Sequence, residues 1–153
     1  MKTPDQMPSP EYVKPTKEYL KEKFDEYNEL YFGGVLSPCK MTLRKDRGTF
    51  GNYNTLRGNI PRISIAQYVY WTEETLKLTL IHEMVHHYVD TVIRPKHFVF
   101  PHGHLFRKVC RMLKKKYGLK VQVLAMPDVY FYKEKIPTTC CGKLWRRYFG
   151  LKF

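Results

Sequence analysis

Apolar residues recur with the period of a helix between residues 16 and 32. Four of them follow the spacing i, i+4, i+7 and i+11: Leu20, Phe24, Tyr27 and Tyr31. This spacing places them on one face of an amphipathic helix. Gly33 and Gly34 come directly after this segment and predict the end of the helix.

Three short segments that resemble strands follow. Residues 41–44 and 63–66 alternate apolar and polar side chains, and residues 48–54 are rich in Gly, Asn and Tyr. We expect three β-strands here. Pro61 stands before the third, which predicts that this strand lies at or near a sheet edge. Such an edge around residues 63–66 is also predicted to bind an extended substrate by strand addition.

Two further helices are predicted in the second half of the chain. Thr72 is a suitable N-cap for a helix that runs to about Ile93 and ends before Pro95. A second helix is expected from Gly103 to Tyr117, and strands or a hairpin are expected at Val121, Val123 and residues 129–132. This order of elements predicts a single α+β domain.

The chain has 153 residues, the size of one domain. Residues 1–15 contain four prolines and no apolar signal segment, so we expect an extended arm before a core at residues 16–125. No apolar run is long enough to cross a bilayer, and we expect no membrane partner. The four cysteines lack the paired spacing of a disulfide framework, which favours a cytoplasmic protein.

The predicted helix after Thr72 contains a metal-binding pattern, His82-Glu83-Met84-Val85-His86. Two histidines four residues apart project from one face of a helix and can share one Zn²⁺. Glu83 is one position further round, where a carboxylate can act as the catalytic acid and base on a water without being a ligand.

A third ligand has to come from elsewhere in the chain. In the metzincin class of zinc hydrolases, the ligand pattern continues with a glycine and a histidine, which would stand here at positions 89 and 92. Both positions are valine, so that class is excluded. A carboxylate ligand from the next predicted helix is excluded because residues 91–127 contain no acid. His97, His102 and His104 remain, and we favour His102 because the adjacent Gly103 allows two backbones to approach closely.

Other polar residues near these histidines have less specific roles. His104 is a candidate for hydrogen bonding around the metal site, and Asp90 could accept a hydrogen bond from a ligand imidazole. His87 is expected to be an ordinary polar helix residue.

The net charge of +13 lies entirely in the second part of the chain. Residues 1–90 hold 12 basic and 12 acidic residues, whereas residues 91–153 hold 15 basic and 2 acidic ones. Basic residues interleaved with aromatic ones suit contacts to phosphates and bases. The candidates for nucleic-acid binding are Arg107, Lys108, Arg111, Lys114, Lys115, Lys116, Lys143, Arg146 and Arg147.

Three ordered motifs resemble those of the SprT-like metallopeptidases: residues 27–36 with their Phe-Gly-Gly end, residues 82–86, and residues 101–106. The resemblance implies a compact zincin-like α+β domain, with a small sheet, an active-site helix and a following helix that carries a ligand. It also implies that His82, His86 and His102 bind one zinc ion and that Glu83 is catalytic. Residues 126–153 form a basic, aromatic extension without the paired cysteines of the zinc ribbon that many relatives have.

The sequence therefore predicts a zinc-dependent endopeptidase whose substrates are proteins bound or crosslinked to DNA, with single-stranded or damaged DNA as a partner. Two alternatives remain open. One is a nucleic-acid-binding module that keeps zinc for stability, although such a module has no use for Glu83. The other is a zinc-dependent nuclease, although the spacing of zinc endoribonucleases would need a histidine in place of Val92.

Overall fold

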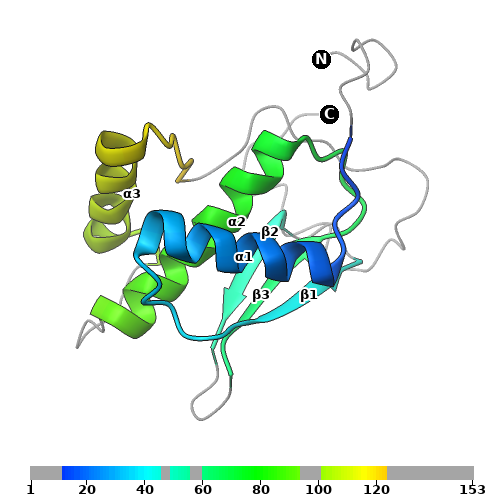
Figure 1. Ribbon diagram of the computed structural model, residues 1–153, viewed down its shortest axis with the longest axis horizontal. Coiled ribbons are helices and arrows are strands. Elements are labelled where there is room, and N and C mark those ends of the chain that lie inside the picture. Colours follow the sequence, from blue (N-terminus) through cyan, green and yellow to red (C-terminus); the bar gives the residue numbers. More distant parts are fainter. Residues whose placement is uncertain (1–11, 46–48, 56–59, 94–100, 124–153) are drawn as a thin grey trace, which may run out of the picture.

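The computed structural model describes residues 12–45, 49–55, 60–93 and 101–123. They form an α+β domain in which three α-helices accompany a three-stranded sheet (Figure 1). In chain order, the elements are α1 (Lys17–Phe32), β1 (Lys40–Arg44), β2 (Gly51–Asn54), β3 (Arg62–Ala66), α2 (Glu73–Tyr88), a π-helical turn (Val89–Ile93) and α3 (His104–Tyr117).

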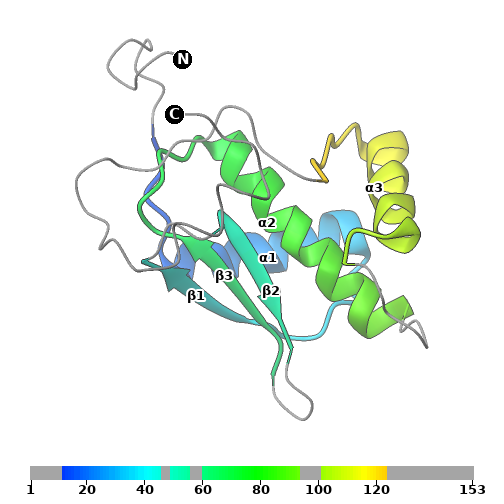
Figure 2. The same ribbon diagram turned by 180° about the vertical axis from the view of Figure 1, so that it is seen from behind.

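The sheet has the strand order β1-β3-β2. Strand β3 pairs in parallel with β1 and antiparallel with β2, which places Ile63 opposite both Met41 and Tyr53. Helices α1 and α2 cover one face of the sheet, and α3 packs against α2 on the side away from the strands (Figures 1 and 2). Helix α2 is thus the central element of the domain.

The prediction that the third strand lies at or near an edge is wrong, because β3 is the central strand. Pro61 precedes the strand, where its missing N–H costs no bond of the ladder, while its carbonyl accepts a hydrogen bond from Lys40 N at 2.8 Å. Strand addition to residues 63–66 is excluded for the same reason, since both sides of β3 are already paired.

Helix α1 begins and ends where the sequence predicts. Thr16 accepts a hydrogen bond from Tyr19 N, and Gly33 ends the helix in the left-handed conformation with φ 66°. Buried Asn28 then exchanges two hydrogen bonds of 3.1 Å with the backbone of Leu36. These bonds hold the connection to β1 against the helix.

Helix α2 starts with a capping box, in which Thr72 and Thr75 each bond the backbone of the other. Its regular part ends at Tyr88, but the helical path continues to Ile93 as the π-helical turn. The predicted end near Ile93 is therefore confirmed, with a change of helix type that the periodicity does not indicate. Leu76, Leu80, Ile81, Met84 and Val85 bury the helix in the core.

The helix of residues 104–117 is confirmed, with Gly103 and Gly118 at its two ends. Its apolar side is buried through Phe106, Val109 and Leu113. Val121 and Val123 lie in an irregular segment after it, and the strand predicted at residues 129–132 lies outside the described residues. Within the part of the chain that the structure describes, no helix is long and apolar enough to cross a membrane.

Candidate metal centre

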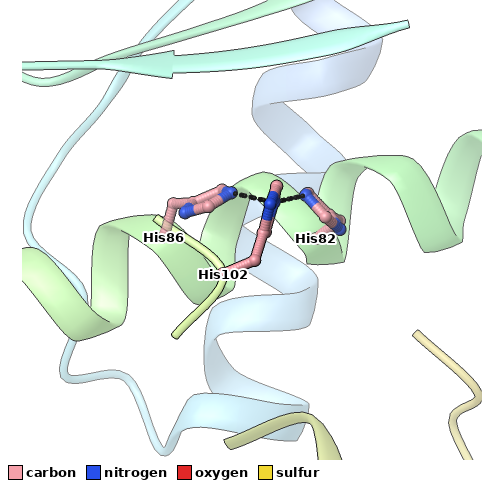
Figure 3. A group of neighbouring side chains, drawn as sticks. All are labelled: His82, His86 and His102. Carbon is pink, nitrogen blue, oxygen red and sulfur yellow. Dashed lines mark hydrogen bonds between the residues drawn. The ribbon is translucent and has the colours of Figure 1, made fainter. Parts of the chain in front are cut away.

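Three imidazoles from two parts of the fold converge on one point (Figure 3). His82 and His86 project from one side of α2, as their spacing predicts, and His102 reaches them from the turn before α3. The Nε2 atom of His102 lies 3.1 Å from Nε2 of His82 and 3.1 Å from Nε2 of His86. The structure thus brings together the two helical histidines and the favoured third one.

The protonation of this cluster follows from a contact outside it. His82 Nδ1 lies 2.7 Å from the carbonyl oxygen of Gln122, so Nδ1 carries the proton and donates it to that oxygen. A neutral His82 then has a lone pair on Nε2. His102 Nε2 has at most one proton and cannot donate to both neighbours at once. Three converging ring nitrogens are therefore better satisfied by one shared cation than by hydrogen bonds to each other.

The spacing of the nitrogens fits a tetrahedral ion. Zinc–nitrogen bonds of about 2.0–2.1 Å at tetrahedral angles imply neighbouring ligand nitrogens about 3.3 Å apart. The two distances of 3.1 Å are close to that value. The Phe106 ring packs against all three imidazoles, with centroid separations of 4.9, 4.5 and 4.9 Å. The three histidines are positioned to bind a metal ion.

Burial keeps these imidazoles neutral. It lowers the pKa of His82 to about 4 and that of His86 to about 3, in the latter case assisted by the neighbouring histidines. Burial also lowers the pKa of His102, with a smaller effect from the positive charge of Arg107. Because protons compete with a metal for ring nitrogens, the site favours metal binding at neutral pH.

Glu83 is 5% exposed and lies beneath β2. Burial raises the pKa of its carboxyl to about 8, while a hydrogen bond from the backbone of Tyr53 and the charge of Arg44 act in the opposite direction. A Cβ atom at Gly51 would lie 2.5 Å from Glu83 Oε1. Residue 51 therefore has to be glycine for Glu83 to occupy this position.

His87 has a structural role and is fully buried. Its Nε2 donates to the carbonyl of Ser37 at 2.9 Å, and its Nδ1 lies 3.3 Å from the Tyr53 hydroxyl. That hydroxyl donates to Asp90 Oδ2 at 2.9 Å. Asp90 is therefore hydrogen-bonded to Tyr53 rather than to a ligand imidazole, and the two contacts tie β2 to the end of α2.

Comparison with known families agrees with this geometry. The SprT-like family model matches residues 20–125. The chain belongs to the SprT-like family. The match includes most of α1 and all of the sheet, α2 and α3, and this family membership indicates a metallopeptidase-like domain. A comparison with curated proteins found no match to the chain.

The remaining predicted residues of this SprT-like domain are not members of the histidine cluster or lie outside the described residues, although Arg107 donates through Nε to the carbonyl of His102 at 3.2 Å. His104 is the first residue of α3 and is exposed, and His97 is not described. The basic candidates on α3 are also exposed: Arg107, Lys108, Arg111, Lys114, Lys115 and Lys116. The basic candidates of the extension, Lys143, Arg146 and Arg147, lie outside the described residues, as do Cys140 and Cys141.

Sequence reasoning missed three groups around the SprT-like site. The carbonyl of Gln122 orients His82, the backbone N–H of Tyr53 bonds Glu83, and Gly51 leaves room for that carboxyl. Two of these are backbone groups that every non-proline residue has, so the sequence contains no signal for them. The glycine at position 51 was visible, but its neighbour Glu83 is 32 positions away.

Proposed function

We propose that this SprT-like domain is a zinc-dependent endopeptidase that acts on proteins associated with DNA. The observation that carries the proposal is the convergence of three neutral imidazoles, together with a buried carboxyl on the helix that carries two of them. A purely structural zinc site has no need for such a carboxyl, because its ligands complete the coordination and no proton has to move.

His82, His86 and His102 would hold the zinc ion. When bound, zinc supplies a Lewis acid that polarises a peptide carbonyl and makes a water more acidic. Glu83 takes a proton from the attacking water and gives it to the leaving amine, which is the role that its position next to the two helical ligands suits. The positive charge of a bound metal also lowers the pKa of Glu83, which favours the carboxylate needed for the first step.

Strand β2 is the element best placed to align a peptide with this site. It pairs with β3 on one side, no described strand pairs with its other side, and it lies over Glu83 through Gly51 and Tyr53. A substrate strand added to β2 would be bound through its backbone. Weak dependence on substrate sequence is the expected consequence.

Association with DNA is supported by the charge distribution. All the excess positive charge lies in the residues after Asp90. Helix α3 comes directly after the turn that carries His102, and its exposed side is basic. A polyanion attracted to this side would bring proteins bound to it close to the metal centre.

The test is to incubate the zinc-loaded protein and its Glu83→Gln variant with a DNA-binding protein, with and without single-stranded DNA. We expect the zinc-loaded protein to cut the protein substrate and leave the DNA intact. The variant should retain one zinc per chain and lose at least about a hundredfold in rate, because it lacks the base. Equal cleavage by both forms would overturn the role of Glu83.

The same experiment separates the two alternatives. Cleaved nucleic acid with intact protein would indicate a nuclease. Binding of DNA and zinc without cleavage of either polymer, at several enzyme concentrations, would indicate a module that uses zinc for stability.

A further inference from the structure

A groove of about 280 Å³ lies between α3 and the segment that follows it. Four exposed cationic side chains line it: Arg107, Arg111, Lys114 and Lys120. The first three follow the spacing i, i+4 and i+7 on α3, so they share one face of the helix and span about 10 Å along it. The groove thus presents a row of positive charges.

This charge has no acidic neighbours along the chain. Residues 91–127 contain no Asp or Glu. Among the described residues, the two ion pairs between side chains both lie within α1. A surface that serves solubility usually mixes both signs of charge, whereas a row of one sign attracts a ligand with repeated charges of the other sign.

The walls of the groove between these cations are apolar. They consist of Cys110 from α3 and of Leu119, Val121 and Val123 from the following segment. A nucleotide chain combines a charged phosphate with a flat apolar base in each unit, so it can use both kinds of surface. A run of acidic residues in a peptide offers the charge but no apolar part to match the walls.

Two hydrogen bonds connect the groove with the metal centre. Arg107, which lines the groove, donates through Nε to the carbonyl of His102 at 3.2 Å. Gln122 lies between two lining residues, Val121 and Val123, and its carbonyl accepts the proton of His82 Nδ1. Two of the three candidate metal ligands are therefore hydrogen-bonded either to a residue that lines the groove or to one that lies between two lining residues in the chain.

We infer that this groove binds the phosphate backbone of single-stranded nucleic acid and that its occupation strengthens the metal centre through Arg107 and Gln122. The inference rests on the proposed association with DNA and gives it a location. A strand bound across α3 and residues 119–123 holds these two elements together, which fixes the carbonyl of Gln122 on His82. By thermodynamic linkage, a ligand that favours the metal-binding arrangement is in turn bound more tightly when the metal is present.

The first test measures binding of a fluorescent 15-mer of thymidine to zinc-loaded protein by anisotropy, at several salt concentrations. All proteins carry Glu83→Gln, so that the result does not depend on cleavage. The groove variant adds Arg111→Gln and Lys114→Gln, which avoids the residue bonded to His102. The matched control adds Lys108→Gln and Lys115→Gln, which remove the same charge from α3 outside the groove.

We expect the groove variant to bind about tenfold more weakly at 0.15 M salt and to reduce the steepness of the salt dependence by about 1.4, because each phosphate contact on a single strand contributes about 0.7. The control should keep most of its affinity. Equal weakening of both variants would overturn the location, since binding would then follow total charge. Preferred binding of a poly-glutamate peptide over the oligonucleotide would overturn the choice of ligand.

The second test measures zinc affinity by competition with a chelator, with and without the oligonucleotide. The protein with Glu83→Gln alone should bind zinc about fivefold more tightly in the presence of the oligonucleotide, a typical coupling between two sites, and the groove variant should show no such gain. An unchanged zinc affinity would overturn the link through Arg107 and Gln122. Neither test needs peptidase activity, so failure of the proposed reaction would be seen separately from failure of the groove.

Discussion

Gly51 and Glu83 are packed so closely that a Cβ atom on residue 51 would lie 2.5 Å from the Oε1 atom of the carboxyl. The two residues belong to β2 and α2, the two elements that line the candidate active site. The strand proposed to align a peptide therefore also limits the position of the proposed general base. A change at either residue alters both functions.

Gly51→Ala should displace Glu83 without unfolding the domain. A shift of about 1 Å in a catalytic group costs about a hundredfold in rate, so peptidase activity should fall by that order while zinc content stays at one ion per chain. The matched control is Asn52→Ala on the same strand, whose side chain is exposed. Full activity of the Gly51→Ala protein would show that the carboxyl does not act from this position.

Tyr53→Phe should destabilise the protein by about 1–3 kcal/mol, because it removes the hydrogen bond that the half-buried carboxylate of Asp90 accepts. The lost hydroxyl donates to Asp90 and contacts His87, which is fully buried. Urea unfolding of the two proteins measures the difference. Tyr19→Phe is the control, since it removes an exposed hydrogen bond to Glu73 and leaves that carboxylate in water. Equal effects of the two changes would contradict a structural role for the Tyr53 hydroxyl.

Glu83→Gln should stabilise the metal-free protein, and increasingly so as the pH rises. The folded pKa of Glu83 is raised to about 8, above the ordinary value, so the unfolded chain loses the proton first. The wild type therefore loses stability between about pH 4.5 and 8, by up to about 1.4 kcal/mol per pH unit relative to the variant. Unfolding of both proteins in the presence of a chelator at pH 5, 6 and 7 checks this. A difference that stays constant with pH would contradict the burial of an ionisable carboxyl here.

Removal of any one of the three ligands should abolish tight zinc binding. We expect His82→Ala, His86→Ala and His102→Ala to reduce zinc content well below one ion per chain, and to remove most of the rise in melting temperature that zinc gives to the wild type. His104→Ala is the control, because His104 is exposed and outside the cluster. Metal analysis and thermal unfolding with and without added zinc provide the two measurements. Retention of zinc by the His102→Ala protein would show that another residue completes the site.

Patterns within short stretches of the chain determined the helices. The limits of α1 and α3 agree with their caps at Thr16, Gly33, Gly103 and Gly118, because a cap acts on the backbone of its own helix. His82 and His86 share a side of α2 for a similar reason, since four residues make about one helical turn. These features depend on contacts between residues a few positions apart in the chain, so they can be predicted from the sequence.

Only the tertiary structure decided the rest. It brought His102, and not His104, to His82 and His86, placed β3 in the centre of the sheet, and brought Gly51 and the carbonyl of Gln122 to Glu83 and His82. These relationships join residues 8 to 40 positions apart, and several of them use backbone atoms that are the same in every residue. The sequence by itself determined which residues could form the metal centre, and the packing of α3 and β2 against α2 determined which of them meet.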